Sequence, residues 1–142
     1  MANPGPASTQ SNHPQVLGTN QAIRLLASYQ GVNVNSVGDT ALPIRDTTNF
    51  SVSNVIFTNA SISLTTAAAG VFTQPAAAGT AIVANAALSA LTGSTVVSQR
   101  TVASTATPPA AVQNLYVNVA TAQGAPATMD VYVYGYDLTF LS

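Results

Sequence analysis

Charge is the scarcest property of this 142-residue chain. Asp, Glu, Lys and Arg together make up 5% of the residues, whereas they make up roughly a quarter of an average soluble protein. The charged residues are three arginines and four aspartates, with a net charge of -1, and there is neither lysine nor glutamate. Binding to a nucleic-acid backbone needs a cluster of basic side chains. Three scattered arginines cannot form one, so nucleic acid is excluded as a partner.

Cysteine is absent as well, which excludes disulfides and thiolate metal sites. The single histidine, His13, lies in a proline-rich stretch rather than on a scaffold that could hold a catalytic triad. There is no calcium-loop motif and no glycine-rich phosphate-binding motif. We therefore expect no catalytic residue, no metal site and no cofactor, and the chain is predicted not to be an enzyme.

The four aspartates do not form a carboxylate pair of the kind that glycosidases use. Asp39 and Asp46 stand in turn-forming sequences, where an Asp side chain normally bonds its own backbone. Asp130 and Asp137 are seven residues apart in one expected strand, so they point to opposite faces. Each aspartate is predicted to form turns or ion pairs.

Long hydrophobic runs are also missing. No basic segment followed by an apolar segment stands at the N-terminus, so no secretory signal is indicated and synthesis in the cytosol is expected. The charge-free stretch from Thr47 to Gln99 contains an Ala-rich part, but Gln74, Pro75 and Asn85 interrupt it. A spanning helix needs about 20 strongly apolar residues. We expect no membrane association.

The length suits one domain with one core. Residues 1–18 contain three prolines among small polar residues, and this composition predicts a flexible arm that cannot build a core. Residues 19–142 are predicted to form a single domain. Within the arm, the candidate partner-binding residues are Asn12, His13, Pro14, Val16 and Leu17.

Short segments of alternating apolar and polar residues fill the domain, separated by turn signals about every ten residues. The expected extended segments are residues 22–29, 32–37, 41–44, 50–58, 61–66, 70–73, 80–84, 94–103, 111–122 and 128–141. Gly31 is expected to separate the first two, and Gly38 to Thr40 to form a turn. Pro43 fits only an edge strand or a strand start. This pattern predicts an all-β fold, an antiparallel β-sandwich of jelly-roll-like form with an extended N-terminal arm.

Two segments also admit a helix. Residues 20–28 could form a helix capped by Asn20, although the β-branched continuation favours a strand. Residues 81–93, AIVANAALSALTG, fit a short helix ending before Gly93 as well as they fit a strand followed by a turn.

The last segment, TMDVYVYGYDLTFLS, is apolar on both faces when it is interpreted as a strand. Tyr132, Tyr134 and Tyr136 share one face, and aliphatic residues share the other. A row of aromatic rings can stack on sugars or bases, but packing in a core or between subunits is the simpler interpretation. One face is expected to fill the core, and the other to meet a second sheet or a partner subunit.

Proteins usually protect exposed strand edges with lysine, with inward-pointing charges or by closing the sheet. This chain has few charges for that purpose, so its edges are expected to be covered within the fold or by neighbouring subunits. A small net charge also favours association. Both features predict a homo-oligomer.

Two blocks of the sequence resemble small structural proteins of tailed bacteriophage virions. They are NVIFTNASISLTTAAAGVFTQPAAAGTAIVANAALSALTG and LYVNVATAQGAPATMDVYVYGYDL, and GVNVNSVGDTALPI near the front fits the same pattern. The resemblance covers residues 22–138. The chain departs from the family in its proline-rich start and in RDTTNFSVSN, where a more basic strand would be expected.

The resemblance implies a capsid decoration or cement protein on the virion surface. Such a protein binds the outside of the assembled head, most plausibly as a trimer, and clamps neighbouring major capsid protein subunits. The arm would become ordered on contact with the capsid or a neighbouring subunit. The alternative is a tail, neck or fibre component whose β-sandwich binds a receptor or a glycan through the tyrosines.

Overall fold

The computed structural model describes residues 23–104 and 110–138, which form eight β-strands and no α-helix. The strands are β1 (Arg24–Asn33), β2 (Gly38–Pro43), β3 (Phe50–Thr58), β4 (Ala68–Gln74), β5 (Ala78–Ala87), β6 (Val97–Arg100), β7 (Asn114–Thr121) and β8 (Thr128–Asp137). The expected arm, with its candidate residues Asn12, His13, Pro14, Val16 and Leu17, lies outside the described residues.

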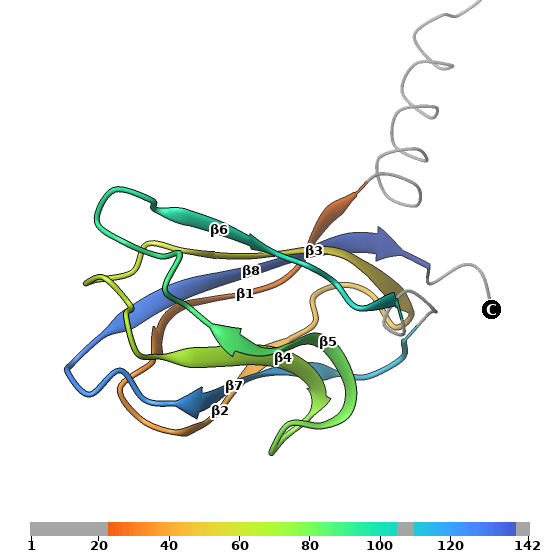
Figure 1. Cartoon of the computed structure of the whole chain (residues 1–142). Helices are drawn as coiled ribbons and strands as arrows, with labels where there is room; N and C mark the ends of the chain where they lie inside the picture. The colour runs from red at the N-terminus through yellow and green to blue at the C-terminus, as the bar shows by residue number, and fades with distance from the viewer. Residues whose placement is uncertain (1–22, 105–109, 139–142) are drawn as a thin grey trace, which may run out of the picture.

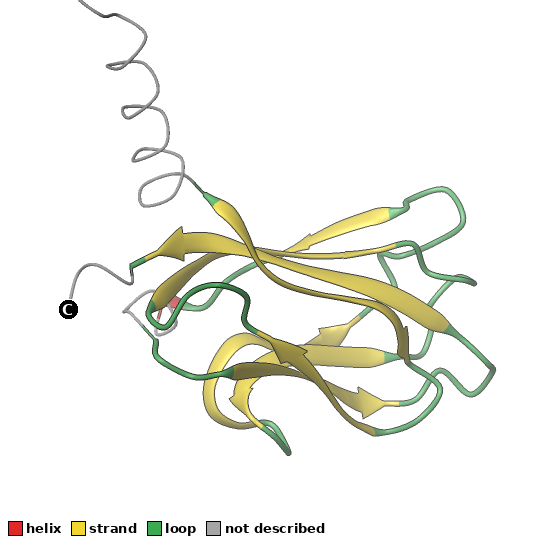
Figure 2. Cartoon of the chain, turned by 180° about the vertical axis from the view of Figure 1, so that it is seen from behind, coloured by secondary structure: helices red, strands yellow, loops and turns green. Residues whose placement is uncertain are grey.

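The strands form two four-stranded antiparallel sheets that pack face to face (Figures 1 and 2). The first sheet has the order β1-β8-β3-β6, and the second has the order β2-β7-β4-β5. The predicted β-sandwich is therefore confirmed. The finer description as a jelly roll stays an interpretation, which the eight strands in two such sheets support.

The core lies between the two inner faces, because the strands alternate buried and more exposed residues. In β8 the buried set is Met129, Val131, Val133, Gly135 and Asp137. In β7 it includes Leu115, Val117 and Val119. Phe50 and Phe57 of β3 are the largest fully buried side chains of the core.

The sandwich has two different ends (Figure 1). We call the first the loop end, because four connections meet there: residues 34–37, 59–67, 88–96 and 122–127. The strand register also places these connections at the same end, since Thr58 pairs there with both Asp130 and Val97. We call the other the terminal end. It holds the described start and finish of the chain, and Phe50 pairs with Asp137 there.

The β4–β5 hairpin folds over part of the outer face of the second sheet. Strand β7 lies between β2 and β4, yet the N–H of Ala76 at the hairpin tip donates to Oδ2 of Asp39 on β2 at 2.8 Å. Nδ2 of Asn85 on β5 likewise reaches across β4 and donates to Oδ1 of Asn118 on β7 at 3.0 Å. The hairpin must therefore fold back across β7. Gly70 allows this approach, because a Cβ atom there would lie 2.8 Å from the backbone nitrogen of Asn85.

Both helix alternatives are wrong within the described residues, since Arg24–Asn33 and Ala78–Ala87 are strands. Residues 22–29 and 32–37 were expected as two segments, but the strand β1 runs from the first into the start of the second and ends at Asn33, with a register shift between Tyr29 and Val32. Gly31, at φ 78°, forms this bulge, and its N–H donates to Asp130.

Two further expectations are corrected. Residues 38–40 belong to strand β2 instead of a turn, and Asp39 pairs there with Asn118. Pro43 does end an edge strand, as predicted. Residues 61–66 form no strand. Their backbone bonds go to separate partners, since Ser61 donates to Thr128 and Leu64 to Leu91, and no ladder forms.

Candidate interaction surfaces

The tyrosines of β8 lie on the outer face of the first sheet, and the aliphatic face of the strand fills the core. The outward side chains alternate with fully buried Val131 and Val133. Tyr132, Tyr134 and Tyr136 are therefore not core residues, which corrects that part of the packing expectation. They stay candidates for a contact between subunits.

Two of the tyrosines belong to an aromatic and aliphatic patch on this face. Tyr134 pairs with Leu25 of β1 and with Asn54 of β3, and Tyr132 pairs with Ile56 of β3. Leu25 is 38% exposed, and Ile56, Tyr132 and Tyr134 are partly exposed. We call Leu25, Ile56, Tyr132 and Tyr134 the outer patch.

The carboxylate nearest to the outer patch along β8, that of Asp130, already has hydrogen-bond partners. Its Oδ1 accepts from the Gly31 N–H at 2.8 Å, and its Oδ2 accepts from Nδ2 of Asn59 at 3.0 Å. The phenol oxygen of Tyr132 accepts from Nε2 of Gln30 at 3.1 Å. The patch thus combines rings, aliphatic carbon and neutral polar groups, which is the composition of the centre of a protein interface.

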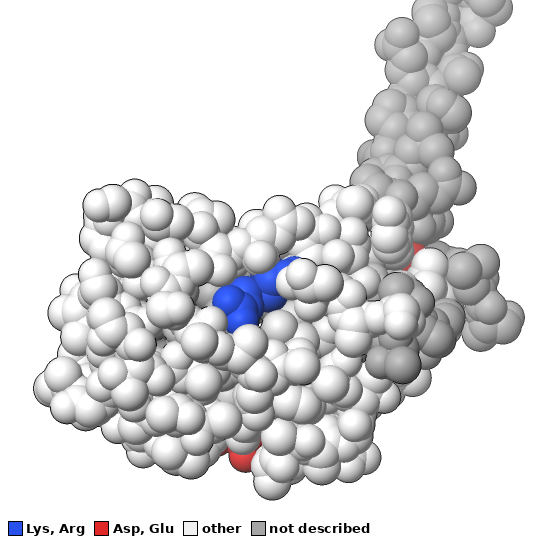
Figure 3. Space-filling view, viewed as in Figure 1, with Lys and Arg blue, Asp and Glu red and all other residues white. Residues whose placement is uncertain are grey.

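A second apolar surface lies at the loop end. Val37 is 64% exposed, Ile62 40%, Val96 56% and Val97 52%. These four residues, which we call the loop tip, make up half of the large hydrophobic side chains that are exposed in the described part of the chain. The four connections at this end contain no charged residue. Figure 3 shows this end of the molecule without any charged atoms on the visible face.

Two charged side chains of the terminal end, those of Arg24 and Asp137, are engaged in structural contacts. Nη2 of Arg24 lies 3.7 Å from Oδ2 of buried Asp137 and donates to the Arg45 carbonyl oxygen at 2.9 Å. The hydroxyl of Thr47 donates to Oδ1 of Asp137 at 2.6 Å. These contacts attach β1 and β8 to the connection between β2 and β3.

The remaining aspartates also have structural surroundings. Asp39 accepts from Ala76 and from Nδ2 of Asn118, and Asp130 binds the bulge at Gly31. Asp46 adopts a left-handed backbone conformation with φ 55°, typical of Asp in a turn. The prediction that Asp130 and Asp137 point to opposite faces is confirmed by their burial pattern.

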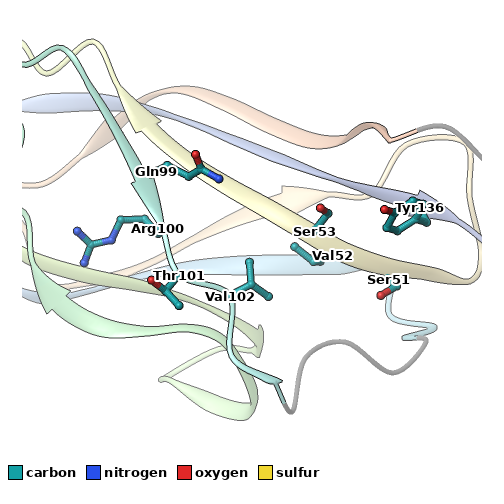
Figure 4. Close-up of a pocket in the computed structure, with 8 residues that line it drawn as sticks. All are labelled: Ser51, Val52, Ser53, Gln99, Arg100, Thr101, Val102 and Tyr136. Carbon is teal, nitrogen blue, oxygen red and sulfur yellow. The ribbon is translucent and has the colours of Figure 1, made fainter.

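A cleft of about 610 Å³ opens beside the first half of β3. Its lining residues are Ser51, Val52, Ser53, Gln99, Arg100, Thr101, Val102 and Tyr136 (Figure 4). Tyr136 therefore belongs to this cleft, beyond the outer patch toward the terminal end. A smaller cleft of about 290 Å³ shares Gln99, Arg100 and Thr101 with it and reaches β5.

Among the described residues, no group of three or more His, Cys, Asp or Glu side chains is placed to hold a metal ion. A search of the same residues finds no helix with the length and hydropathy that crossing a membrane requires. Comparisons of the chain with protein-family models, with curated proteins and with solved structures find no match.

The sequence analysis did not identify the loop tip or the cleft. The sequence contains part of the signal for the loop tip but none for the cleft. The absence of charge from the four connections is readable in the sequence. The exposure of Ile62 cannot be read from the sequence, because Leu64, two residues later in the same alternating pattern, is fully buried. The cleft depends on where β6 leaves β3, for which the sequence has no local signal.

Proposed function

We propose that this protein is a nonenzymatic capsid decoration protein of a tailed bacteriophage, which binds the outside of the assembled head. The proposal starts from the resemblance of residues 22–138 to small virion structural proteins. The observation that carries it is the loop tip, a set of exposed aliphatic side chains at the end of the sandwich whose four connections contain no charged residue. Exposed apolar surface gathered at one end is typical of a surface that binds another protein.

The partner at the loop tip is the major capsid protein. A surface that offers aliphatic carbon and neutral loop backbone binds by apolar burial and hydrogen bonding, and such contacts depend weakly on salt. Decoration should therefore persist at high ionic strength. Localisation on the virion follows from this partner.

The second contact is between copies of the chain. The outer patch of Leu25, Ile56, Tyr132 and Tyr134 supplies an uncharged face for a homo-oligomer, which we propose to be a trimer. Each subunit would then present one loop tip to the capsid. Several modest contacts held in one oligomer add up to high avidity, which would staple adjacent capsid subunits.

Binding to heads tests the function directly. Purified protein is mixed with undecorated heads of the tailed phage that encodes it, and the heads are sedimented and assayed for bound protein. The proposal predicts saturable binding that is retained at 1 M salt, by the screening argument above. Folded protein that stays in the supernatant would contradict it and would favour a tail, neck or fibre component.

The oligomer is tested by Tyr134→Asp, which places a charge in the outer patch. We expect the variant to elute as a folded monomer in size-exclusion chromatography with light scattering. Thr121→Asp, at an exposed position of β7 in the second sheet, is the control and should leave the oligomer intact. A Tyr134→Asp protein of unchanged size would show that the outer patch is not the subunit contact.

A further inference from the structure

The cleft beside β3 exists because the first sheet divides at the terminal end. Strand β6 pairs with β3 only from Val55 to Thr58. After Arg100 the chain crosses to the second sheet, where the N–H of Ala103 donates to the Ile82 carbonyl oxygen at 2.9 Å. Strand β3 continues to Phe50. The cleft of about 610 Å³ lies along this divergence, within the size range of small-ligand sites.

The lining of the cleft combines one aromatic ring with neutral polar groups. Tyr136, 39% exposed, stands on one side, and Gln99 is exposed on the other. Figure 4 shows Ser53 between them and Thr101 and Val102 on the segment that leaves the sheet. Buried Val52 and half-buried Val102 supply the apolar part of the lining.

The cleft lining contains no carboxylate, and its one cation is engaged elsewhere. The guanidinium carbon of Arg100 lies 5.6 Å from the centre of the Phe57 ring, and Nη1 donates to the Ala87 carbonyl oxygen at 3.3 Å. In Figure 4 the Arg100 side chain extends away from Tyr136 and Ser53. A charged ligand between these two residues would therefore lose its hydration without gaining a counter-charge.

We propose that this cleft binds a neutral saccharide. The C–H face of a sugar ring stacks on an aromatic ring such as Tyr136. A side-chain amide offers two donors and one acceptor, so Gln99 can pair with the donor and acceptor functions of adjacent sugar hydroxyls. The Ser53 hydroxyl, which donates to Oδ1 of Asn54 at 2.8 Å, can still accept a bond from a sugar hydroxyl, and the Thr101 hydroxyl can accept or donate one. The proposal does not rest on the capsid function, because the cleft lies away from the loop tip.

Titration followed by heteronuclear NMR of the full chain tests this site. The probes are glucose, galactose, N-acetylglucosamine, lactose and maltose, with glucuronate as the charged comparison. We expect at least one neutral sugar to shift the amide signals of residues 51–53 and 99–102 in a saturable way. Glucuronate should bind more weakly than glucose.

Two variants localise the contact. Tyr136→Ala should weaken binding at least tenfold, and Tyr136→Phe should restore most of it, because the ring carries the stacking. Tyr29→Ala is the matched control, because Tyr29 is 41% exposed on β1 of the same sheet and lies outside the cleft, and this variant should bind as the unchanged protein does. An unchanged thermal midpoint for each variant shows that the fold is retained.

Four results would overturn the proposal. They are no saturable shift with any neutral sugar, equal losses of affinity for Tyr136→Ala and Tyr29→Ala, tighter binding of glucuronate than of glucose, and shifts confined to residues outside the cleft. A Ser- and Thr-rich peptide that shifts the cleft signals when no sugar does would assign the cleft to peptide binding instead.

Discussion

The two ends of the sandwich differ in how many charged residues they contain and in what their surfaces expose. The terminal end contains Arg24, Arg45, Asp46 and Asp137, whereas the four connections of the loop end contain no charged residue. The loop end exposes aliphatic side chains at Val37, Ile62 and Val96. The ion pair of Arg24 with Asp137 therefore helps to hold the terminal end together, whereas the connections of the loop end are neutral and expose aliphatic carbon.

The difference follows from what each end must satisfy. At the terminal end, Asp137 is buried, and a buried carboxylate is costly unless it is paired and hydrogen-bonded. Arg24 and Thr47 supply those partners. At the loop end, backbone groups pair with one another, as in the bonds from Leu64 to Leu91 and from Gln123 to Val34, and with neutral side chains such as that of Gln123. The four connections therefore keep their order largely through neutral groups, and Asp130 of β8 adds a bond from Asn59.

The largest effect should come from placing a charge at the loop tip. Ile62→Asp should lower the apparent affinity for undecorated heads about 100-fold, because an unpaired carboxylate would lose its water in the contact. Sedimentation with heads at a series of protein concentrations measures the affinity. Salt should not restore the binding, since the loss comes from desolvation.

Ile23→Asp is the matched control at the terminal end. Ile23 is 50% exposed and Ile62 is 40% exposed, so both substitutions introduce a charge at a comparably exposed isoleucine. We expect Ile23→Asp to bind heads normally. Equal losses of affinity for the two variants would contradict the assignment of the capsid contact to the loop end. A loss of affinity for Ile23→Asp alone would place that contact at the terminal end.

The next largest effect concerns the ion pair of the terminal end. Arg24→Met keeps the aliphatic stem but leaves the buried Asp137 carboxylate without its cation, so it should lower the free energy of unfolding by about 2 kcal/mol. Urea denaturation measures the change. Arg45→Met is the control: its side chain is exposed and makes no hydrogen bond or ion pair with the residues that the structure describes, so the change should stay within about 0.5 kcal/mol.

A still smaller effect is expected at Asn59, which orders one loop of the loop end. Asn59 has a left-handed backbone with φ 53°, and its Nδ2 donates to Asp130. Asn59→Ala should destabilise the protein by about 1 kcal/mol, because alanine loses the bond and tolerates this conformation less well. Thermal unfolding measures it. Ser36→Ala, a substitution of an exposed residue in the neighbouring connection, should have almost no effect on stability. A loss of stability for Ser36→Ala as large as that for Asn59→Ala would contradict this account.

Regular alternation of apolar and polar residues predicted most of the strands correctly. It could not show which alternating segments find a partner strand, because distant segments of the chain supply that partner. The pattern of β7 and β8 predicts both the strands and their buried faces, because period two alone sorts Leu115, Val117 and Val131 inward. Residues 61–66 alternate just as well but form no strand. Their partners, Thr128 and Leu91, are decided by how three connections meet.

The candidate surfaces divide in the same way. The tyrosine row was identified from the sequence, but its position outside the core depends on which face of β8 the second sheet covers. The separation of Tyr136 from Tyr132 and Tyr134 depends on the early departure of β6 from β3. The predicted turn or ion-pair role holds for Asp46 and Asp137. It is wrong for Asp39 and Asp130, which lie in strands and accept hydrogen bonds from neutral groups distant in sequence.

The most direct test of the account is the orientation of the protein on the head, measured by cryo-electron microscopy of undecorated heads after incubation with the purified chain. The account predicts regular density over the capsid lattice, with the connections at residues 34–37, 59–67 and 88–96 against the major capsid protein and the Arg24–Asp137 pair facing outward. Density with the terminal end against the capsid would contradict the assignment of the two ends, and bare heads beside folded protein would contradict the decoration function itself.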